Sequence, residues 1–194
     1  MNPYIKCPKF ENENFILRLV HKKDTSDLLL VYSDEYAVPY FNSDNCDGDN
    51  FYYVSINQMK QAIEYWQFEY NRRGFVRWTI IDKNINHAIG TIELFNRKSN
   101  DYFHNCGLLR LDLRSDYEKA NVIYEILSLI IKDAFDLFSC SKIATKVPSF
   151  ANERKKAVRG LGFQESKEKL IGDNDHQAYQ DYYILEKENC DSYE

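Results

Sequence analysis

Acidic and aromatic side chains gather between residues 33 and 53. The carboxylates are Asp34, Glu35, Asp44, Asp47 and Asp49, and the rings belong to Tyr36, Tyr40, Phe41, Phe51, Tyr52 and Tyr53. Carboxylates attract an ammonium group by charge, and aromatic faces attract it through cation–π contacts. The segment therefore suits a cationic amine, although a loop that is merely solvated by water would have the same composition.

The sequence holds no recognisable metal site. In the run from Asp44 to Asn50, Gly48 stands at position 5 and no Glu closes the loop, so the spacing excludes an EF-hand. The five cysteines, at positions 7, 46, 106, 140 and 190, are scattered, and none has metal-ligand spacing to another cysteine or a histidine. We therefore expect no metal, and free thiols as in a reducing cytoplasm.

The composition is that of one folded domain covering residues 1–194. Apolar residues make up 44% and aromatic residues 15% of the chain, too many for a disordered protein. The 25 Lys and Arg against 30 Asp and Glu give a net charge of −5, which argues against a nucleic-acid partner. The sequence lacks an apolar run of about 18 residues and a secretory signal, so we expect a cytoplasmic protein without a membrane partner.

Strand and helix patterns alternate along the chain. We expect strands at 15–20, 75–82, 87–95, 106–113, 142–147, 164–170 and 179–186, and helices at 28–32, 55–71, 118–138 and 152–159. In the second helix, for example, Ile56, Met59 and Ile63 recur at helical spacing. The hairpin in the middle, with its turn at 83–86, predicts a mixed sheet.

This order of elements, with three short stretches, resembles the GNAT superfamily of acyl-CoA-dependent acetyltransferases. FILR at 15–18 and LVYSD at 30–34 are similar to the opening RLxLR…D…LxxLYSD of the RimJ/RimL-like branch, named for ribosomal-protein N-terminal acetyltransferases. AIGTIELF at 88–95 is similar to the branch's xIGxIxL strand. Glu125 to Phe135, followed by LGF at 161–163, is similar to its EAL…aF and lGF.

The resemblance implies an α/β fold of the α+β type, with a mixed central sheet of about seven strands flanked by about four helices. It implies an N-acetyltransferase that moves an acetyl group from acetyl-CoA to a primary amine by direct attack in a ternary complex. The amine would be a protein N-terminus or a small cationic amine, and the enzyme a monomer or a homodimer.

In this family acetyl-CoA binds where the strand at 106–113 meets the next helix. Backbone amides of the turn cradle the pyrophosphate, because free N–H groups and the positive end of the helix dipole attract anions. The resemblance assigns these residues to the cofactor: Leu111, Leu113, Arg114, Lys119, Ala120, Asn121, Val122, Ile123 and Asn152. Leu111 and Leu113 would act through backbone amides. Asn152 would lie near the pantetheine arm, or else cap its helix.

The turn at 118–123 departs from the family's R-G-x-G-x-A pattern. Lys119 and Asn121 replace the glycines, and Glu118 replaces the arginine, where its charge would oppose phosphate. Asn tolerates left-handed backbone, and Arg114 and Lys119 supply positive charge. An ordinary helix start capped by Asp116 is the competing interpretation.

Acetyl transfer needs a group that takes a proton from the amine and one that protonates the thiolate. His104 and Glu93, which lies on the neighbouring strand, are the candidate bases, and Asp112 is a third. Imidazole is the side-chain group whose ordinary pKa lies nearest neutrality. Tyr183, or Tyr182 beside it, is the candidate acid. Because the family's usual carboxylate and acid are missing, a second function stays open: a catalytically weakened GNAT-fold protein that binds a ligand or a partner.

Overall fold

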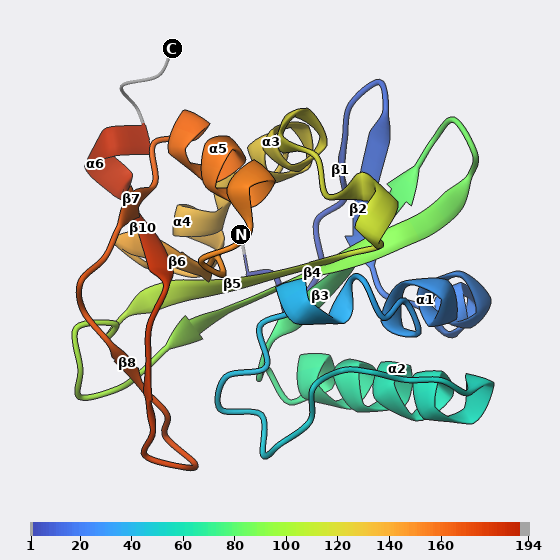
Figure 1. The fold of residues 1–194 in the computed structure, drawn as a ribbon, viewed down its shortest axis with the longest axis horizontal. Helices are drawn as coiled ribbons and strands as arrows, with labels where there is room; N and C mark the ends of the chain where they lie inside the picture. The colour runs from blue at the N-terminus through green and yellow to red at the C-terminus, as the bar shows by residue number, and fades with distance from the viewer. Residues whose placement is uncertain (1, 191–194) are drawn as a thin grey trace.

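Helices cover both faces of an eight-stranded mixed sheet in the computed structural model, which describes residues 2–190 (Figure 1). The strands are β1 (Phe10–Glu11), β2 (Phe15–Leu19), β3 (Val76–Asp82), β4 (His87–Arg97), β5 (Cys106–Leu113), β6 (Lys142–Lys146), β7 (Gln164–Glu165), β8 (Leu170–Ile171), β9 (Ala178–Tyr179) and β10 (Tyr182–Glu186). The α-helices are α1 (Thr25–Tyr32), α2 (Ile56–Asn71), α3 (Ala120–Ser128), α4 (Ile131–Leu137), α5 (Asn152–Gly160) and α6 (Lys187–Cys190). Short 3₁₀ turns are η1 (Lys22–Asp24), η2 (Val38–Tyr40) and η3 (Ser115–Tyr117).

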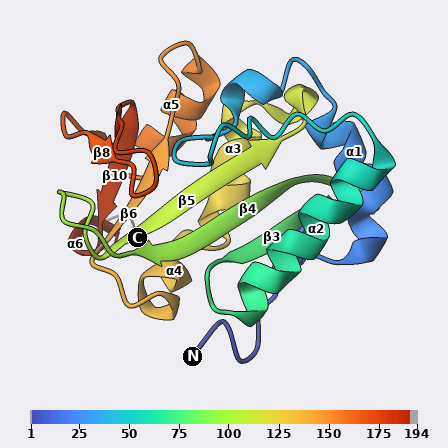
Figure 2. The same cartoon turned by 90° about the horizontal axis from the view of Figure 1, so that it is seen from below.

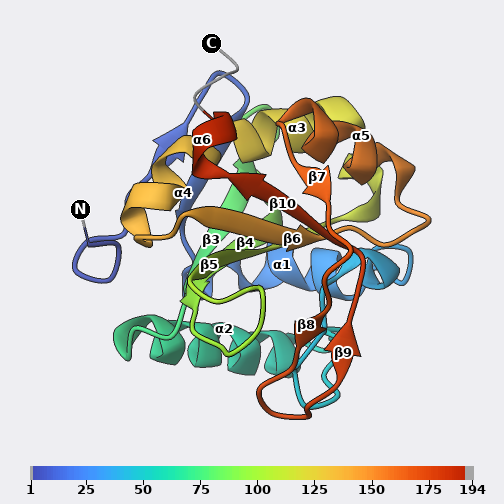
Figure 3. The same cartoon turned by 90° about the vertical axis from the view of Figure 1, so that its left-hand side faces the viewer.

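The main sheet has the strand order β1-β2-β3-β4-β5-β6-β10-β7. Its neighbours are antiparallel except β5 and β6, which run parallel because α3 and α4 form the crossover between them. Strands β8 and β9 form a separate hairpin that projects from the sheet (Figure 3). The predicted mixed α/β sheet is thereby confirmed.

The two faces of the sheet differ in chemistry. Strand residues alternate between faces, so Trp78, Ile92 and Leu111 point into one apolar core, where they meet α3, α4 and α5. The opposite face lies under α1 and α2, as Figure 2 shows. It carries the other residues of each strand, among them buried Arg77 and Glu93.

The segment 118–138 forms two helices, whereas its periodicity predicts one. α3 ends at Ser128 and α4 begins at Ile131. Between them the N–H groups of Leu129 and Ile130 donate to carbonyls three residues back, at 3.3 and 3.1 Å, which is the tighter spacing of a 3₁₀ turn. Residues on both sides of this turn pack in the same core, so the apolar stripe runs on across the break and cannot reveal it.

The two last predicted strands are also divided. Of the predicted 164–170 strand, only β7 pairs with β10, and its end forms β8 of the separate hairpin. Within the predicted 179–186 strand, Asp181 takes a φ of 69°, which ends β9 and lets β10 begin at Tyr182.

Strands β5 and β6 part before β5 ends. The register pairs the first four residues of β5 with the first four of β6 and goes no further. On its other edge β5 stays paired with β4 as far as Leu113. Since the Arg114 N–H donates to the Ile89 carbonyl of β4 at 3.0 Å, the alternation of an antiparallel ladder turns the N–H groups of Leu111 and Leu113 toward the open edge.

Gly90 of β4 lies against β5 with no room for a side chain. A Cβ there would stand 2.1 Å from the Asp112 carbonyl oxygen and 2.9 Å from a Leu113 methyl carbon. We predict that Gly90→Ala lowers the free energy of unfolding by about 1–3 kcal/mol, because the strands must move apart. Chemical denaturation measures this difference.

Gly160→Ala is the matched control. A Cβ at Gly160, the last residue of α5, would meet only the Tyr124 ring, at 3.4 Å. Alanine favours helix, so this variant should be as stable as the wild type or more stable by about 0.5–1 kcal/mol. Equal stability of the two variants would contradict the close approach at Gly90.

Candidate active site

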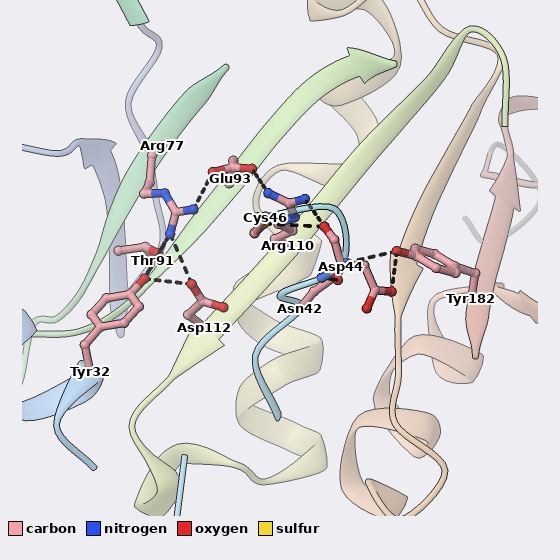
Figure 4. Close-up of polar contacts among 10 residues, drawn as sticks. All are labelled: Tyr32, Asn42, Asp44, Cys46, Arg77, Thr91, Glu93, Arg110, Asp112 and Tyr182. Carbon is pink, nitrogen blue, oxygen red and sulfur yellow. Dashed lines mark hydrogen bonds and ion pairs between the residues drawn. The ribbon is translucent and has the colours of Figure 1, made fainter. Parts of the chain in front are cut away.

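A row of charged side chains crosses the sheet on the face beneath α1 and α2 (Figure 4). Arg77 of β3 and Arg110 of β5 are both register partners of Glu93 on β4. Arg77 Nη2 donates to one carboxylate oxygen of Glu93, and Arg110 Nη1 donates to the other at 2.9 Å. Arg77 and Glu93 are each 1% exposed, so this is a buried chain of alternating charge.

Glu93 is held in its ionised form. Burial raises the pKa of this carboxyl, but the two guanidinium groups outweigh burial and hold the pKa below its ordinary value. Both oxygens already accept hydrogen bonds from arginines. This geometry argues against the predicted role of Glu93 as the base.

The row continues to α1 through Arg77 Nη1, which donates to the Tyr32 hydroxyl at 2.9 Å and to Asp112 Oδ2 at 3.1 Å. Tyr32 in turn donates to Asp112 at 2.7 Å, and its hydroxyl lies 2.8 Å from Thr91 Oγ1. Burial raises the pKa of Tyr32 well above its ordinary value, so it stays a donor. Oδ1 of Asp112 is buried without a hydrogen-bond partner among residues 2–190.

At its other end the row meets the acidic, aromatic loop. The backbone carbonyl of Asp44 accepts from Arg110 Nη2 at 3.0 Å. Its carboxylate pairs with Lys146, the last residue of β6, at 2.6 Å and accepts from the Tyr182 hydroxyl at 3.0 Å. Asn42 Nδ2 also donates to Tyr182, at 3.3 Å. The loop is therefore fastened over the place where β5 and β6 part.

A cavity of about 180 Å³ opens beside the row. Its floor is the Arg77, Glu93 and Arg110 chain, its walls are Phe51, Tyr65, Trp66 and Phe75, and the exposed Asp47 and Asp49 stand at its rim. The guanidinium carbon of Arg77 lies 4.2 Å from the centre of the Trp66 ring. Two carboxylates and one ring of the 33–53 segment, those of Asp47, Asp49 and Phe51, therefore lie at one cavity.

Cys46 lines the same cavity. Burial raises the pKa of its thiol to about 11, so it stays protonated and is a poor nucleophile. The four cysteines whose side chains are described are free thiols. Within residues 2–190 no three His, Cys, Asp or Glu side chains are placed to hold a metal ion, and no helix is long and apolar enough to cross a membrane.

The turn between β5 and α3 is held by α5. Glu118 points toward Arg154 and accepts from its Nε at 2.9 and 3.1 Å, and both side chains are about nineteen-twentieths buried. The backbone N–H of Ala120, the first residue of α3, donates to Glu153 at 2.8 Å. Asp116, the alternative cap, pairs with Arg114 at 2.7 Å, and no side chain at the N-cap position of α3 accepts a hydrogen bond from the helix.

The other predicted cofactor residues lie around this turn. Lys119 is the exposed N-cap residue of α3, Asn121 is exposed, and Ile123 is buried in the core. Asn152 is the first residue of α5 and is exposed, and Ala151 occupies the N-cap position that the alternative interpretation gave to Asn152. The residues predicted to bind the cofactor are thus brought together at one end of β5.

Two of the predicted catalytic residues are not directed at this end of β5, because His104 lies before the strand and Tyr183 points to the other face of the sheet. His104 is exposed in the loop before β5, with Nδ1 2.6 Å from the Ser99 carbonyl oxygen. The stretch of β5 from Cys106 to Leu111 alone, which separates His104 from Leu111, extends roughly 17 Å. Tyr183 points to the α5 side, where its hydroxyl donates to Glu165 at 3.2 Å. Tyr182, its neighbour, is the tyrosine that faces the charged row.

Sequence reasoning did not single out Arg77 or Arg110. The signal that marks them is a lone charge inside an apolar strand, as in VRWTI around Arg77 and LLRL around Arg110. A charge that a strand must bury needs a partner on the neighbouring strand. Glu93, in TIEL, has the same setting.

Comparison with known proteins places this geometry in context. The sequence model of a family described as "Acetyltransferase (GNAT) domain" matches residues 14–164. No curated protein matches the sequence.

Three similar solved structures share the fold. They are the ribosomal-protein-S5-alanine acetyltransferase of Vibrio fischeri (17% identity, 91% of this chain and 94% of that chain covered, TM-score 0.67), a GNAT-family acetyltransferase of Bacillus anthracis (12%, 93% and 99%, 0.66), and Mycobacterium smegmatis RimJ in complex with CoA-disulfide (13%, 90% and 82%, 0.66).

The charged row predicts a specific dependence of stability on pH. The pKa of Glu93 is lowered from its ordinary value of 4.5 in the folded protein. Its contribution to the free energy of unfolding is therefore complete above about pH 4.5 and is lost as the pH falls through the lower, folded-state pKa. We predict that Glu93→Gln costs about 3–5 kcal/mol at pH 7 and removes part of this acid dependence.

Denaturation curves between pH 7 and pH 3 measure both effects. Glu64→Gln is the control, because Glu64 pairs with Lys22 at the surface and its side chain is 56% exposed. It should leave the stability at pH 7 nearly unchanged. A Glu93→Gln protein with wild-type stability at pH 7 would show that the row is not required for the fold.

Proposed function

The chain belongs to the GNAT acetyltransferase family, and we propose that it moves the acetyl group of acetyl-CoA to a cationic primary amine, either a protein N-terminus or a small amine. The observation that carries this proposal is the open edge of β5, whose Leu111 and Leu113 N–H groups have no strand partner on that side and lie just before the start of α3. These free N–H groups support the proposal, because the arm of an acyl-CoA needs hydrogen-bond donors.

The open edge suits the arm of acetyl-CoA. The pantetheine arm contains amide groups, and a chain of amides adds to a free strand edge by backbone hydrogen bonds. Beyond the edge, the N–H groups of Asn121 and Val122 in the first turn of α3 have no acceptor among residues 2–190. These donors and the helix dipole suit the pyrophosphate.

The transfer needs no covalent intermediate on the protein. The amine nitrogen attacks the thioester carbon, a C–N bond forms and the C–S bond breaks. A negative charge develops on the carbonyl oxygen during the attack, and we assign its stabilisation to the Leu111 N–H. A fixed hydrogen-bond donor stabilises this charged oxygen more than it stabilises the neutral thioester. The proton of the amine leaves through water at the rim beside Asp47 and Asp49.

Tyr182 is the acid that this geometry supports for the departing thiolate. It is paired with Lys146, the last residue of β6, where β5 and β6 have parted. Burial raises the pKa of Tyr182, with Asp44 acting in the same direction, so its proton is retained at neutral pH. We assign the proton that the departing thiolate takes up to this hydroxyl on the ground of its position, and Tyr182 regains a proton from water after the transfer.

The cavity supports a cationic acceptor. The exposed Asp47 and Asp49 attract an ammonium group to its mouth, and the walls Phe51, Tyr65 and Trp66 offer aromatic faces. The floor holds two guanidinium groups and the Glu93 carboxylate, and Asp112 beside Arg77 supplies the second negative charge. The rim carboxylates therefore carry the net charge that an approaching amine meets.

Calorimetric titration with acetyl-CoA and CoA at low salt tests the donor site. We expect binding in the micromolar range that Asn121→Asp weakens about tenfold, because the new carboxylate stands in the first turn of α3 beside the phosphates. Asn100→Asp is the control, since this exposed residue in the loop after β4 adds the same charge away from the turn. No binding at millimolar acetyl-CoA would favour the second function, a protein that binds another ligand or a partner.

Tyr182→Phe tests the acid. We predict that kcat falls at least 100-fold, because proton donation to the thiolate is lost. The affinity for CoA should be kept, because the substitution leaves the acetyl-CoA site intact. Release of free thiol, measured with short peptides and diamines as acceptors, gives the rate. Tyr183→Phe is the control on the opposite face of β10 and should keep its rate. An equal loss in both variants would indicate damage to the strand and not the loss of an acid.

A further inference from the structure

The start of α3 already holds an anion, and this anion is one of the protein's own side chains. Glu153, the second residue of α5, accepts the hydrogen bond from the Ala120 N–H at 2.8 Å. The next two N–H groups, of Asn121 and Val122, have no acceptor among residues 2–190. A carboxylate therefore lies where the proposed function places the pyrophosphate of acetyl-CoA.

The other carboxylate near the turn, that of Glu118, does not oppose a phosphate in the way that Glu153 does. Glu118 is paired with Arg154, and the side chains of the two are 5% and 4% exposed. Arg154 Nη1 also donates to the Tyr40 carbonyl at 3.1 Å, so the pair is fixed on both sides. The arginine neutralises Glu118, and a phosphate at the turn meets no net charge from this pair.

Glu153 is differently held. The residue is exposed, and the bond to Ala120 is the one hydrogen bond that its side chain makes with residues 2–190. Because it lies on α5 and not on the turn, a rotation of its side chain into solvent frees the Ala120 N–H while the backbone stays in place. A phosphate and this carboxylate need the same donor and carry the same sign of charge, so they exclude each other.

We propose that Glu153 is an internal competitor of the donor's pyrophosphate and thereby sets the affinity of the protein for acetyl-CoA. The inference rests on the proposed function. When the donor is absent the carboxylate satisfies the first N–H of α3, and when the donor binds, its phosphate takes that N–H and Glu153 turns to solvent. The affinity for CoA is then weaker than the turn alone would give.

The proposed competition predicts that removal of the Glu153 carboxylate affects two ligands differently. CoA carries the pyrophosphate, whereas pantetheine has the same amide arm and no phosphate. Removal of the Glu153 carboxylate should therefore strengthen the binding of CoA and leave the binding of pantetheine unchanged. A general loosening of the cleft would change both.

Calorimetric titrations of the wild type, Glu153→Ala and Glu153→Gln with CoA and with pantetheine at low salt test this proposal. We expect Glu153→Ala to bind CoA about tenfold more tightly, and Glu153→Gln, which keeps the acceptor oxygen and loses the charge, to show a smaller gain. Glu168→Ala is the matched control, because it removes an exposed carboxylate elsewhere and should change neither affinity.

Different results overturn different statements. If the wild type binds CoA and Glu153→Ala binds it no more tightly, the competitor role is wrong and the proposed function stands. The same holds if pantetheine gains as much as CoA. If neither ligand binds the wild type or any variant, the proposed function fails and the inference fails with it. The Gln variant keeps these outcomes readable should the Ala variant be too unstable to titrate.

Discussion

The pairing of buried charges across the sheet is the constraint that the rest of the structure depends on. Arg77, Glu93 and Arg110 stand opposite one another on three neighbouring strands, and none can be buried without its neighbour. A slip of the β4 register by one residue would turn Glu93 into the apolar core and leave both arginines unpaired. The charges therefore fix the alignment of the central strands as firmly as the apolar core does. Through Tyr32 and Asp44 they also hold α1 and the acidic loop against the sheet.

Because of this alignment, groups of strand β5 point into three different environments. The side chain of Leu111 enters the apolar core, the side chain of Arg110 joins the charged row, and the N–H of Leu111 points along the sheet to the open edge. The parting of β5 and β6 creates that edge within the plane of the sheet. Helix α5 has a similar double role, since Ala157 and Val158 pack into the core while the start of the helix meets the turn before α3.

The order of strands and helices follows from periodicity, because alternation within a strand and spacing within a helix are local properties. The assignment of Leu111 and Leu113 to the cofactor follows instead from the family resemblance. Pairs of residues that lie far apart in the chain leave no such local pattern. Nothing around Glu93 indicates that arginines 16 and 17 residues away occupy both of its oxygens, and nothing around Ala120 indicates Glu153, 33 residues later. Whether Tyr182 or Tyr183 is the better candidate for the acid depends on which face of β10 meets the charged row. The sequence of two adjacent tyrosines does not reveal which face that is.

The mouth of the cavity is built partly from exposed residues outside the main sheet. Asn45 of the acidic loop accepts the Asn174 N–H of the β8–β9 hairpin at 2.9 Å, and the carboxylates nearby are exposed. The hairpin projects from the main sheet, as Figure 3 shows. Asp47, Asp49 and Asn174 line the cavity without pairing with its buried charges, so substitutions at these three positions leave the Arg77, Glu93 and Arg110 chain in place. Under the proposed function, acceptor preference can therefore diverge between descendants of this chain through these surface positions at little cost in stability, while the open edge of β5 is inherited unchanged.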